Sequence, residues 1–432
     1  MGRTVSAWVT SGADYLGVVG PFAVDVPWWA EVEPVIAYVQ GVLDVEVLVL
    51  RLLRVDGGEG GRDGHVTYHV EALRRPAPGL LTRRPIDEAA LTRPERLRSP
   101  WARVAGLREV FGWATELLAA AGRPVTGPIR QRKTWNLAGL FLLPTDRGTV
   151  WLKTTPHFAA DEGAVIGAFA NLDPGLVPTV IAAGPGRVLL EHLPGEDCWD
   201  ASVQAITSAV TRMVAAQSAL AGPAGHGLAG PAGHGLAGPA GLGFAGPAGL
   251  GLRDLRGSVI AGQVRDLLAG PVGRELTAEE LAGAHRLVER WPMLDECGLP
   301  DTIVHGDFHS GNWRSDGGPP VVVDFADAHL GNPVLDGVRV CDFLPETKRP
   351  AAARAWIDAW TSQVPGCDPA RALSVAEPLA HLSYAVRYQE FLDGIEPSER
   401  IYHLGDPATV IRAALRVRPA WPRAGSLPRP AR

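Results

Sequence analysis

The first hundred residues carry both strand and helix patterns of apolar residues. Residues 65–73 alternate apolar and polar side chains, which is the period of a half-buried strand. The polar positions include His65 and His69, and we expect both to face solvent because no Cys or carboxylate set stands beside them at metal-ligand spacing. Further strand and helix patterns cover residues 15–19, 28–43 and 45–55. These patterns predict a small α+β module over residues 1–100, which ends in a linker rich in Pro and Arg.

A second set of patterns follows a predicted helix over residues 101–121. The sequence Gly-Arg-Pro directly after it is typical of a helix end. The next apolar patterns predict two strands joined by a turn, then a helix, then another strand: residues 137–143, residues 149–153, a helix that begins at Glu162, and residues 188–193. Residues 101–195 are therefore predicted to form a linking helix and a small β-rich unit.

Helical spacing dominates the remainder of the chain. The predicted helices cover residues 203–219, 277–291, 351–363 and 369–392. A capping-box sequence from Thr277 to Glu280 opens the second of them, and we expect this helix to pack under the loop described below. The fold class is α+β, with a mostly helical unit over residues 196–415 and a frayed tail over residues 416–432.

Residues 220–251 are four successive octapeptides. Each octapeptide holds three Gly and one Pro, a composition that disfavours both a helix and a paired strand. Few large apolar side chains are present, so the repeats offer little surface from which to build a core. We predict a flexible insertion within the helical unit, in which His226 and His234 recur with the repeat and do not act as metal ligands.

Composition and charge narrow the class of protein. The chain has 432 residues, of which 46% are hydrophobic and 20% are charged, as in globular proteins. The net charge of −6 leaves no basic surplus for nucleic acid, and no segment reaches the roughly 18 consecutive apolar residues of a membrane span. The four cysteines lie far apart and no secretory signal is visible. We expect a cytoplasmic protein with reduced thiols, and its oligomeric state stays open.

Residues 304–327 bring three oxygen ligands into one short stretch. Asp307 and Asn312 stand on a loop marked by two glycines, and Asp324 directly follows a run of three valines. Mg²⁺ prefers oxygen ligands of this kind, and a further carboxylate can accept the proton of a hydroxyl that attacks a phosphate. The stretch therefore predicts a phosphoryl-transfer site, where a protein mainly positions a hydroxyl and a metal-bound nucleotide.

The same stretch resembles a known family. Residues 305–312 read His-Gly-Asp-Phe-His-Ser-Gly-Asn, which is similar to the HGDxHxGN signature of the aminoglycoside phosphotransferase and choline kinase group. The resemblance covers residues 129–415 and implies a two-lobed protein-kinase-like fold, with a β-rich lobe and a larger helical lobe. It implies Asp307 as the catalytic base, His305 as a support for the loop, and Asn312 and Asp324 as ligands of Mg²⁺.

A later segment, Gly-Asn-Pro-Val-Leu-Asp, resembles the part of the family that braces the catalytic loop. By this resemblance the carboxylate of Asp336 would hold the loop backbone. Asp336 could equally cap the helix that follows it.

The resemblance also implies a nucleotide-binding side. Lys153 ends a predicted strand and Glu162 opens the next helix, which resembles the ion pair that orients the phosphates of ATP or GTP. Backbone groups from Glu191 to Leu193 would meet the base. Residues 133–139 depart from the glycine-rich kinase pattern because they contain one Gly, which leaves open the amides that cover the phosphates.

The acceptor implied by this group is a small molecule that bears a hydroxyl. Acidic residues receive the cationic substrate in aminoglycoside phosphotransferases, and an excess of acidic residues follows position 388: Glu390, Asp393, Glu396 and Glu399. A solvated acidic helix end explains this excess equally well. An aminoglycoside or related antibiotic leads as acceptor, while choline, a sugar or homoserine stay open. A catalytically silent nucleotide-binding module is the alternative from another class.

Overall fold

The computed structural model describes residues 2–221 and 250–417. The octapeptide insertion and the predicted tail therefore lie almost wholly outside the described residues. The chain divides into two compact units. The N-terminal unit comprises Met1–Phe158, Ile181–His192 and Glu390–Leu404, and the C-terminal unit comprises Ala159–Val180, Leu193–Gln389 and Gly405–Arg432.

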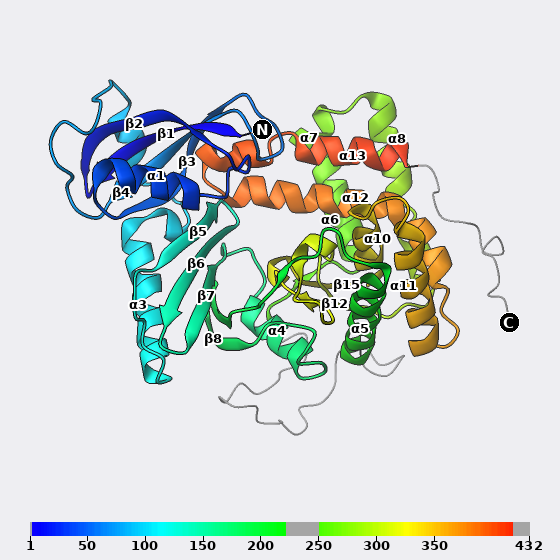
Figure 1. The fold of residues 1–432 in the computed structure, drawn as a ribbon. Coiled ribbons are helices and arrows are strands. Elements are labelled where there is room, and N and C mark those ends of the chain that lie inside the picture. Colours follow the sequence, from blue (N-terminus) through cyan, green and yellow to red (C-terminus); the bar gives the residue numbers. More distant parts are fainter. Residues whose placement is uncertain (1, 222–249, 418–432) are drawn as a thin grey trace. The chain divides into compact units, whose positions relative to one another are not determined.

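The N-terminal unit begins with a four-stranded sheet in the order β2-β1-β4-β3. The elements are β1 (Arg3–Ser11), β2 (Asp14–Val24), α1 (Glu33–Leu43), β3 (Val47–Asp56) and β4 (His65–Ala72). Strands β1 and β4 are parallel, whereas the other neighbours are antiparallel. Val35 and Val39 of α1 share one apolar core with the sheet, and Figure 1 shows α1 beside this sheet. The predicted small α+β module is thus confirmed.

One expectation for this module is wrong. His69 is only 5% exposed, because its ring lies between Thr10 and Arg51. Thr10 Oγ1 is 2.8 Å from Nε2, and Arg51 Nη1 donates to Nδ1 at 2.8 Å. Burial and the neighbouring Arg51 lower the pKa of His69 to about 3, so the ring is neutral. His65 is half-buried and contacts two hydroxyls of β1, and the polar side chains of β4 therefore pack inside the protein.

A five-stranded antiparallel sheet follows, in the order β5-β6-β7-β9-β8. Its elements, with the helix that precedes it, are α3 (Val104–Ala120), β5 (Arg130–Trp135), β6 (Ala138–Thr145), β7 (Gly148–Thr154), β8 (Val180–Gly184) and β9 (Arg187–Glu191). Leu107, Val110 and Leu118 of α3 pack against Phe141 and Leu152 of the sheet, and Figure 1 shows α3 beside this sheet. Most of residues 133–139, expected to form a loop over the phosphates, is strand, and only Asn136 and Leu137 turn from β5 into β6.

The two sheets of the N-terminal unit are joined directly. The Gln131 side chain of β5 accepts a hydrogen bond from Val49 N at 3.0 Å and donates to Val49 O at 2.7 Å. The predicted linker between the sheets is also packed, since α2 (Glu88–Thr92) and a 3-10 turn (Pro100–Ala102) interrupt it. Leu91 and Trp101 in these turns are buried. The first hundred residues are therefore integrated into the unit that carries the second sheet.

The C-terminal unit is mostly helical. Its helices are α4 (Glu162–Ala170), α5 (Val203–Ala221), α6 (Gly257–Ala269), α7 (Pro271–Arg274), α8 (Ala278–Val288), α9 (Pro292–Asp295), α10 (Val334–Asp342), α11 (Arg349–Gln363), α12 (Pro369–Gly394) and α13 (Asp406–Arg416). The end of α12, from Glu390, is counted with the N-terminal unit. With the two sheets described above, this arrangement confirms the predicted mixed α+β class.

Two small sheets complete the C-terminal unit. They are β10-β13-β14 and β11-β15-β12. Their strands are β10 (Glu196–Asp197), β11 (Arg253–Asp254), β12 (Thr302–Val304), β13 (Trp313–Ser315), β14 (Val321–Val322) and β15 (His329–Gly331). The loop of interest runs from β12 to β13, and Asp324 directly follows the run of valines that contains β14. Both small sheets therefore serve to position that loop.

The capping box of α8 is confirmed, but the place of this helix differs from the prediction. Thr277 Oγ1 accepts from Glu280 N at 3.2 Å, and Glu280 Oε2 accepts from Thr277 N at 2.9 Å. Helix α8 packs mainly against α6 and α13, whereas α5 packs on β12. Helix α5 thus supports the loop, a role that the sequence analysis gave to α8.

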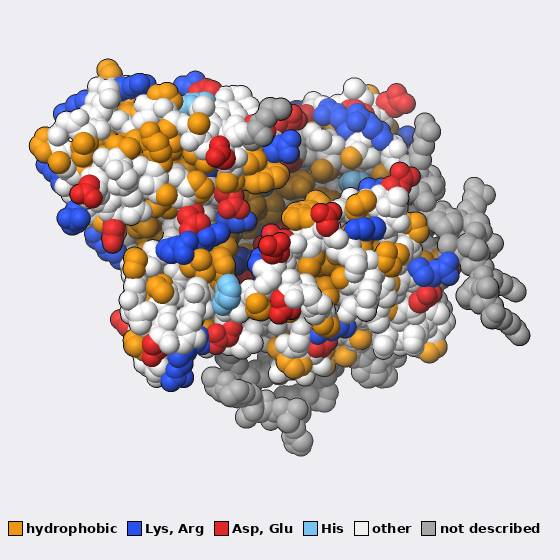
Figure 2. Space-filling view, in the orientation of Figure 1, with side chains coloured by type: hydrophobic (Ala, Val, Ile, Leu, Met, Phe, Trp, Pro, Cys, Tyr) orange, Lys and Arg blue, Asp and Glu red, His pale blue; other side chains and the backbone are white. Residues whose placement is uncertain are grey.

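The surface and the thiols agree with the composition. On the face drawn in Figure 2, acidic and basic side chains are interspersed over the described residues. All four cysteines are free thiols. No helix in the described part of the chain has the length and apolar character needed to cross a membrane.

Candidate active site

The loop between β12 and β13 begins with a backbone that only glycine accommodates. Gly306 has a φ of 86°, and a Cβ at this position would lie 2.4 Å from Asp327 O. The next residue is Asp307. His305, which is fully buried, fixes the loop from inside: its Nδ1 accepts from Asp307 N at 3.2 Å, and its Nε2 donates to Val323 O at 3.0 Å. His305 therefore ties the loop to the strand that leads to Asp324.

A carboxylate on α10 holds the same loop from the other side. Asp336 accepts hydrogen bonds from His305 N at 2.8 Å and from Gly306 N at 3.0 Å. Its Oδ2 also accepts a hydrogen bond from Gln217 Nε2 at 2.7 Å. Two buried backbone N–H groups thus find their partner in one side chain. Asp336 therefore holds the backbone of the loop between β12 and β13, as the first of the two roles considered for it requires.

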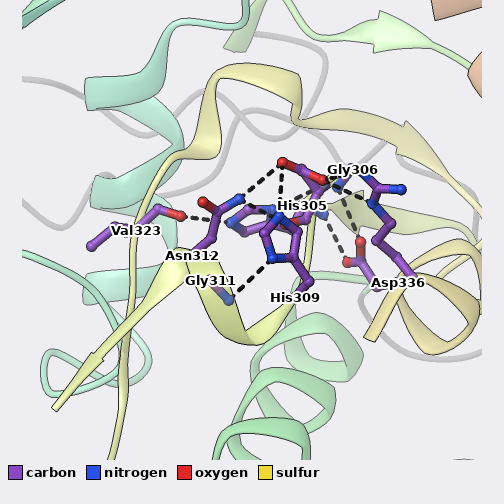
Figure 3. Close-up of polar contacts among 9 residues, drawn as sticks. His305, Gly306, His309, Gly311, Asn312, Val323 and Asp336 are labelled. Carbon is purple, nitrogen blue, oxygen red and sulfur yellow. Dashed lines mark hydrogen bonds and ion pairs between the residues drawn. The ribbon is translucent and has the colours of Figure 1, made fainter. Parts of the chain in front are cut away.

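Three side chains surround the carboxylate of Asp307, and Figure 3 labels two of them, His309 and Asn312. Arg339 Nε and Nη2 lie 2.8 and 2.7 Å from Oδ1. Asn312 Nδ2 donates to Oδ2 at 2.9 Å, and His309 Nε2 lies 3.3 Å from Oδ2. Burial alone would raise the pKa of Asp307, but the His309 hydrogen bond and the Arg339 charge outweigh it, and the pKa is lowered. Asp307 is therefore ionised at neutral pH, and a hydroxyl can donate a hydrogen bond to it.

The sequence analysis missed Arg339. The signal was present, because Arg339 follows Asp336 by one helical turn on α10. Side chains at this spacing lie on the same face of a helix. Once Asp336 was expected to brace the loop, a cation one turn later was a candidate partner for Asp307.

The two predicted metal ligands are brought together by the backbone. Val323 N donates to Asn312 O at 2.8 Å, and this bond sets the residue before Asp324 beside Asn312. The amide nitrogen of Asn312 is bonded to Asp307, so the amide oxygen is the atom left to bind a cation. Asp324 has a φ of 68°, a left-handed conformation that is uncommon outside glycine and frequent at functional sites.

This ligand set fits Mg²⁺, which commonly takes one or two protein oxygens and completes its shell with phosphates and waters. Within the described ranges no group of three or more His, Cys, Asp or Glu side chains could hold a metal ion. An all-protein metal cage is therefore not what the described residues offer.

The predicted nucleotide-binding residues lie in both units. Lys153 is a buried residue of β7 in the N-terminal unit. Glu162 is the first residue of α4 in the C-terminal unit, and its Oε1 accepts from Phe325 N at 3.0 Å. Glu162 therefore holds the backbone directly after Asp324. The pairing of Lys153 with Glu162 stays a prediction.

The expected hinge follows β9. Glu191 is the last residue of this strand, and Arg123 Nη2 donates to its Oε2 at 3.0 Å. The carboxylate is thus engaged by Arg123, while the predicted contact with a base concerns the backbone. Leu193 is half-buried, and its part in base binding stays a prediction.

Two of the four acidic acceptor candidates have a structural role instead. Glu396 is 4% exposed, and its Oε2 lies 3.0 Å from Arg98 Nε and 3.5 Å from Arg51 Nε. Glu399 is equally buried, and its Oε1 accepts from Leu52 N at 3.3 Å. Both carboxylates therefore belong to the interior of the N-terminal unit. Their burial does not support the expectation that they receive a cationic acceptor. It does not support the alternative either, in which they lie on a solvated helix end.

The other two candidates lie nearer the surface. Glu390 is half-buried and Asp393 is exposed, and both stand at the end of α12. Their role as acceptor ligands stays a prediction.

The sequence matches the model of the phosphotransferase enzyme family over residues 140–373, which is more than half of the chain. The chain belongs to the phosphotransferase enzyme family. The match includes Lys153, the catalytic loop and α10. This phosphotransferase is therefore an enzyme that acts on small molecules, as the resemblance predicted.

Solved structures with a similar fold include three small-molecule kinases. The macrolide 2′-phosphotransferase of Brachybacterium faecium is 20% identical, with a TM-score of 0.44, and the match covers 69% of this chain and 97% of that one. A choline/ethanolamine kinase family protein of Mesorhizobium loti is 15% identical, with a TM-score of 0.45 and coverage of 71% and 95%. A spectinomycin phosphotransferase, solved with ADP and spectinomycin, is 10% identical, with a TM-score of 0.45 and coverage of 71% and 97%. Among curated proteins, none matches the sequence significantly.

Proposed function

We propose that this phosphotransferase moves the γ-phosphoryl group of ATP or GTP to a hydroxyl of a small molecule, with Mg²⁺. The observation that carries the proposal is the arrangement of one loop, in which Asp307 is kept ionised beside Asn312 and the segment that bears Asp324. Phosphoryl transfer needs little more from a protein than a positioned hydroxyl and charge stabilisation at the phosphates.

Asp307 orients the acceptor. A hydroxyl that donates a hydrogen bond to its carboxylate has its oxygen aimed at the γ-phosphorus. As the new P–O bond forms, the bond to the β-phosphate oxygen breaks, and the hydroxyl proton passes to Asp307 and then to solvent. Because Arg339 and His309 lower the pKa of Asp307, the carboxylate is a weak base. A loose transition state tolerates this, since the hydroxyl loses its proton late.

The donor side comprises the predicted metal ligands and the predicted nucleotide contacts. Asn312 and Asp324 would hold Mg²⁺, which when bound neutralises charge on the β- and γ-phosphates. Lys153 would contact the phosphates, and the backbone from Glu191 to Leu193 would meet the base. Asp336 and His305 make hydrogen bonds to the backbone of the loop, so we assign them as positioning residues.

The structure weakens the prediction that the acceptor is an aminoglycoside. It rested on four acidic residues, and two of these are engaged inside the N-terminal unit. The similar structures named above are a macrolide 2′-phosphotransferase, a choline/ethanolamine kinase family protein and a spectinomycin phosphotransferase. Macrolides, choline, ethanolamine and spectinomycin each bear a hydroxyl. The acceptor is therefore proposed as a small alcohol, and an aminoglycoside, choline, a sugar and homoserine remain members of the set to be tested.

A phosphorylation screen tests this function. The enzyme is incubated with Mg²⁺ and γ-labelled ATP or GTP and with each candidate alcohol, and label in the alcohol is measured. We expect transfer that requires Mg²⁺ and is lost in Asp324→Ala. Nucleotide binding without transfer to any alcohol would instead support the silent module. Nucleotide binding unaffected by Mg²⁺ or by Asp324→Ala would place the metal elsewhere.

A further inference from the structure

Three aromatic rings gather beside the catalytic loop of the C-terminal unit, and we call Trp199, His309 and Phe343 the aromatic cluster. The ring centroids of Trp199 and His309 are 5.3 Å apart, those of His309 and Phe343 are 4.3 Å apart, and those of Trp199 and Phe343 are 6.2 Å apart. All three pairs of rings are in contact, so the rings form a triangle and not a column. The cluster joins the segment before α5, the catalytic loop and the end of α10.

The outer rings of the cluster are unusually exposed. Trp199 is 50% exposed and Phe343 is 38% exposed, whereas His309, which contacts both rings, is buried. Neighbouring exposed apolar side chains can mark a ligand-binding site. Such a surface beside a catalytic carboxylate is therefore a candidate for substrate contact.

The cluster is held in place although its surface is open. Cys198 N donates to Trp313 O at 3.1 Å, and Lys348 Nζ donates to Ala201 O at 2.8 Å, which fixes the backbone on both sides of Trp199. Gly311 leaves room for the indole, since a Cβ there would lie 2.2 Å from Trp199 Cζ2. Rigid aromatic rings of this kind bind a ligand with little loss of conformational entropy.

The cluster contacts the catalytic carboxylate through two side chains. His309 Nε2 is 3.3 Å from Asp307 Oδ2. Arg339, which pairs with Asp307 Oδ1, also lies over the Phe343 ring at 4.3 Å from its centroid. A molecule that rests on Trp199 and Phe343 is therefore within one side chain of the group that orients the attacking hydroxyl.

We propose that the aromatic cluster is the acceptor subsite, and that it takes an alcohol with a ring whose apolar face packs on Trp199 and Phe343. This inference rests on the proposed phosphotransferase function. A flat ring can cover two neighbouring exposed rings, and its hydroxyl can then reach Asp307. The acceptor class is thus a sugar, a cyclitol or a macrocyclic compound that carries one.

The geometry disfavours a small quaternary ammonium alcohol such as choline. Aromatic recognition of a cation requires ring faces that surround a common space. Here the rings pack on one another at 4.3 to 6.2 Å, and Arg339 already lies over Phe343. The carboxylate that His309 contacts, Asp307, is also paired with Arg339, so it does not offer a free charge to a cationic acceptor.

The test compares ring-bearing alcohols with acyclic ones. Spectinomycin, a macrolide and a series of monosaccharides form the first group, and choline and ethanolamine form the second. We expect transfer only to members of the first group. For the best acceptor, Trp199→Ala and Phe343→Ala should each raise KM by about 10- to 100-fold, the cost of losing one stacked ring, with KM for ATP near the wild-type value.

Two further variants distinguish the loss of a ring contact with the acceptor from a general loss of folding. Trp199→Phe keeps a ring and should restore most of the affinity. Trp28→Ala removes a tryptophan that is equally exposed at 48% but lies in the N-terminal unit, and it should leave KM unchanged for both substrates.

Several results would overturn the acceptor assignment while leaving the proposed function intact. They are transfer to choline or ethanolamine in preference to every ring-bearing alcohol, an unchanged acceptor KM in both alanine variants, and a rise in KM for ATP instead of the acceptor. Binding of no ring-bearing alcohol by calorimetry would also overturn it. Failure of the proposed function looks different, because label would then appear in no alcohol of either group.

Discussion

Two carboxylates, one in each unit, reach opposite charge states. In the C-terminal unit, Asp307 has Arg339, His309 and Asn312 around its two oxygens, and its pKa is lowered. In the N-terminal unit, burial raises the pKa of Glu399 to about 8, and the neighbouring Glu396 adds to the effect. The same chemical group is thus an anion in one cluster and a neutral acid in the other at pH 7.

The number of donors given to each carboxylate explains the difference. Burial disfavours the charged form of any carboxylate, and it acts on both. Asp307 receives donors on each oxygen, including a full positive charge. Glu399 receives one backbone N–H from Leu52, while the two arginines of its cluster lie against Glu396. The partners of Asp307 therefore keep it charged for its proposed role in catalysis, whereas Glu399 is packed as a neutral side chain.

Replacing each acid by its amide should separate the two roles. Asp307→Asn removes the anion that orients the acceptor hydroxyl, and turnover should fall by about 10²- to 10⁴-fold, the range for a positioned acid–base group. Nucleotide affinity should change little, because Asp307 is not a predicted phosphate ligand. Steady-state kinetics and nucleotide titration measure the two quantities.

The matched control for that experiment is Glu399→Gln, the same change of acid to amide in the other cluster. Its turnover per folded molecule should stay near the wild-type value. Near-normal turnover in Asp307→Asn would remove Asp307 from the mechanism, and equal losses in both variants would mean that the assay reports folding.

Removing Glu396 should destabilise the protein with little effect on chemistry. Glu396→Ala leaves Arg51 and Arg98 buried without the carboxylate that pairs with both. Loss of one partner of a buried ion pair typically costs about 3 to 5 kcal/mol of unfolding free energy. Urea denaturation measures this cost, and a change below about 1 kcal/mol, the usual size for an exposed pair, would contradict the burial of the cluster.

The catalytic loop could be predicted from the sequence because its parts are close together in the chain. Asp307, Asn312 and Asp324 lie within one short stretch. The glycines of this stretch predict a loop, and the run of valines predicts the strand that leads to Asp324. Glu396 is the opposite case, since its partner Arg98 stands 298 positions away. A run of acidic residues in the sequence does not reveal that an arginine so far away in the chain pairs with one of them. The acidic residues were therefore expected at the surface.

The strands show a similar division. Alternating apolar residues predicted β4, β6 and β7, but β5 was missed because the residues that it buries are polar, Gln131 and Thr134. Gln131 is buried because its amide pairs with the backbone of Val49 in the other sheet. Hydrophobic periodicity cannot detect a strand whose inward side chains make hydrogen bonds instead of apolar contacts.

The smallest expected effect is the pH dependence that Glu399 gives to stability. Its pKa is about 8 in the folded protein and 4.5 as the ordinary value, so the folded state binds more protons than the unfolded state between these pH values. Unfolding free energy should therefore fall as pH rises through this window.

Glu399→Gln stays neutral and can still accept from Leu52 N, so this loss should disappear. Relative to wild type, the variant should gain on the order of 1 to 3 kcal/mol between pH 5 and pH 8. Denaturant titrations at the two pH values measure the gain, with Glu116→Gln, an exposed site on α3, as the control. If the two stability curves stay parallel, Glu399 is ionised in the folded protein and the contrast with Asp307 is lost. If they diverge as expected, Glu399 is protonated in the folded protein, whereas Asp307 stays ionised because Arg339 pairs with it.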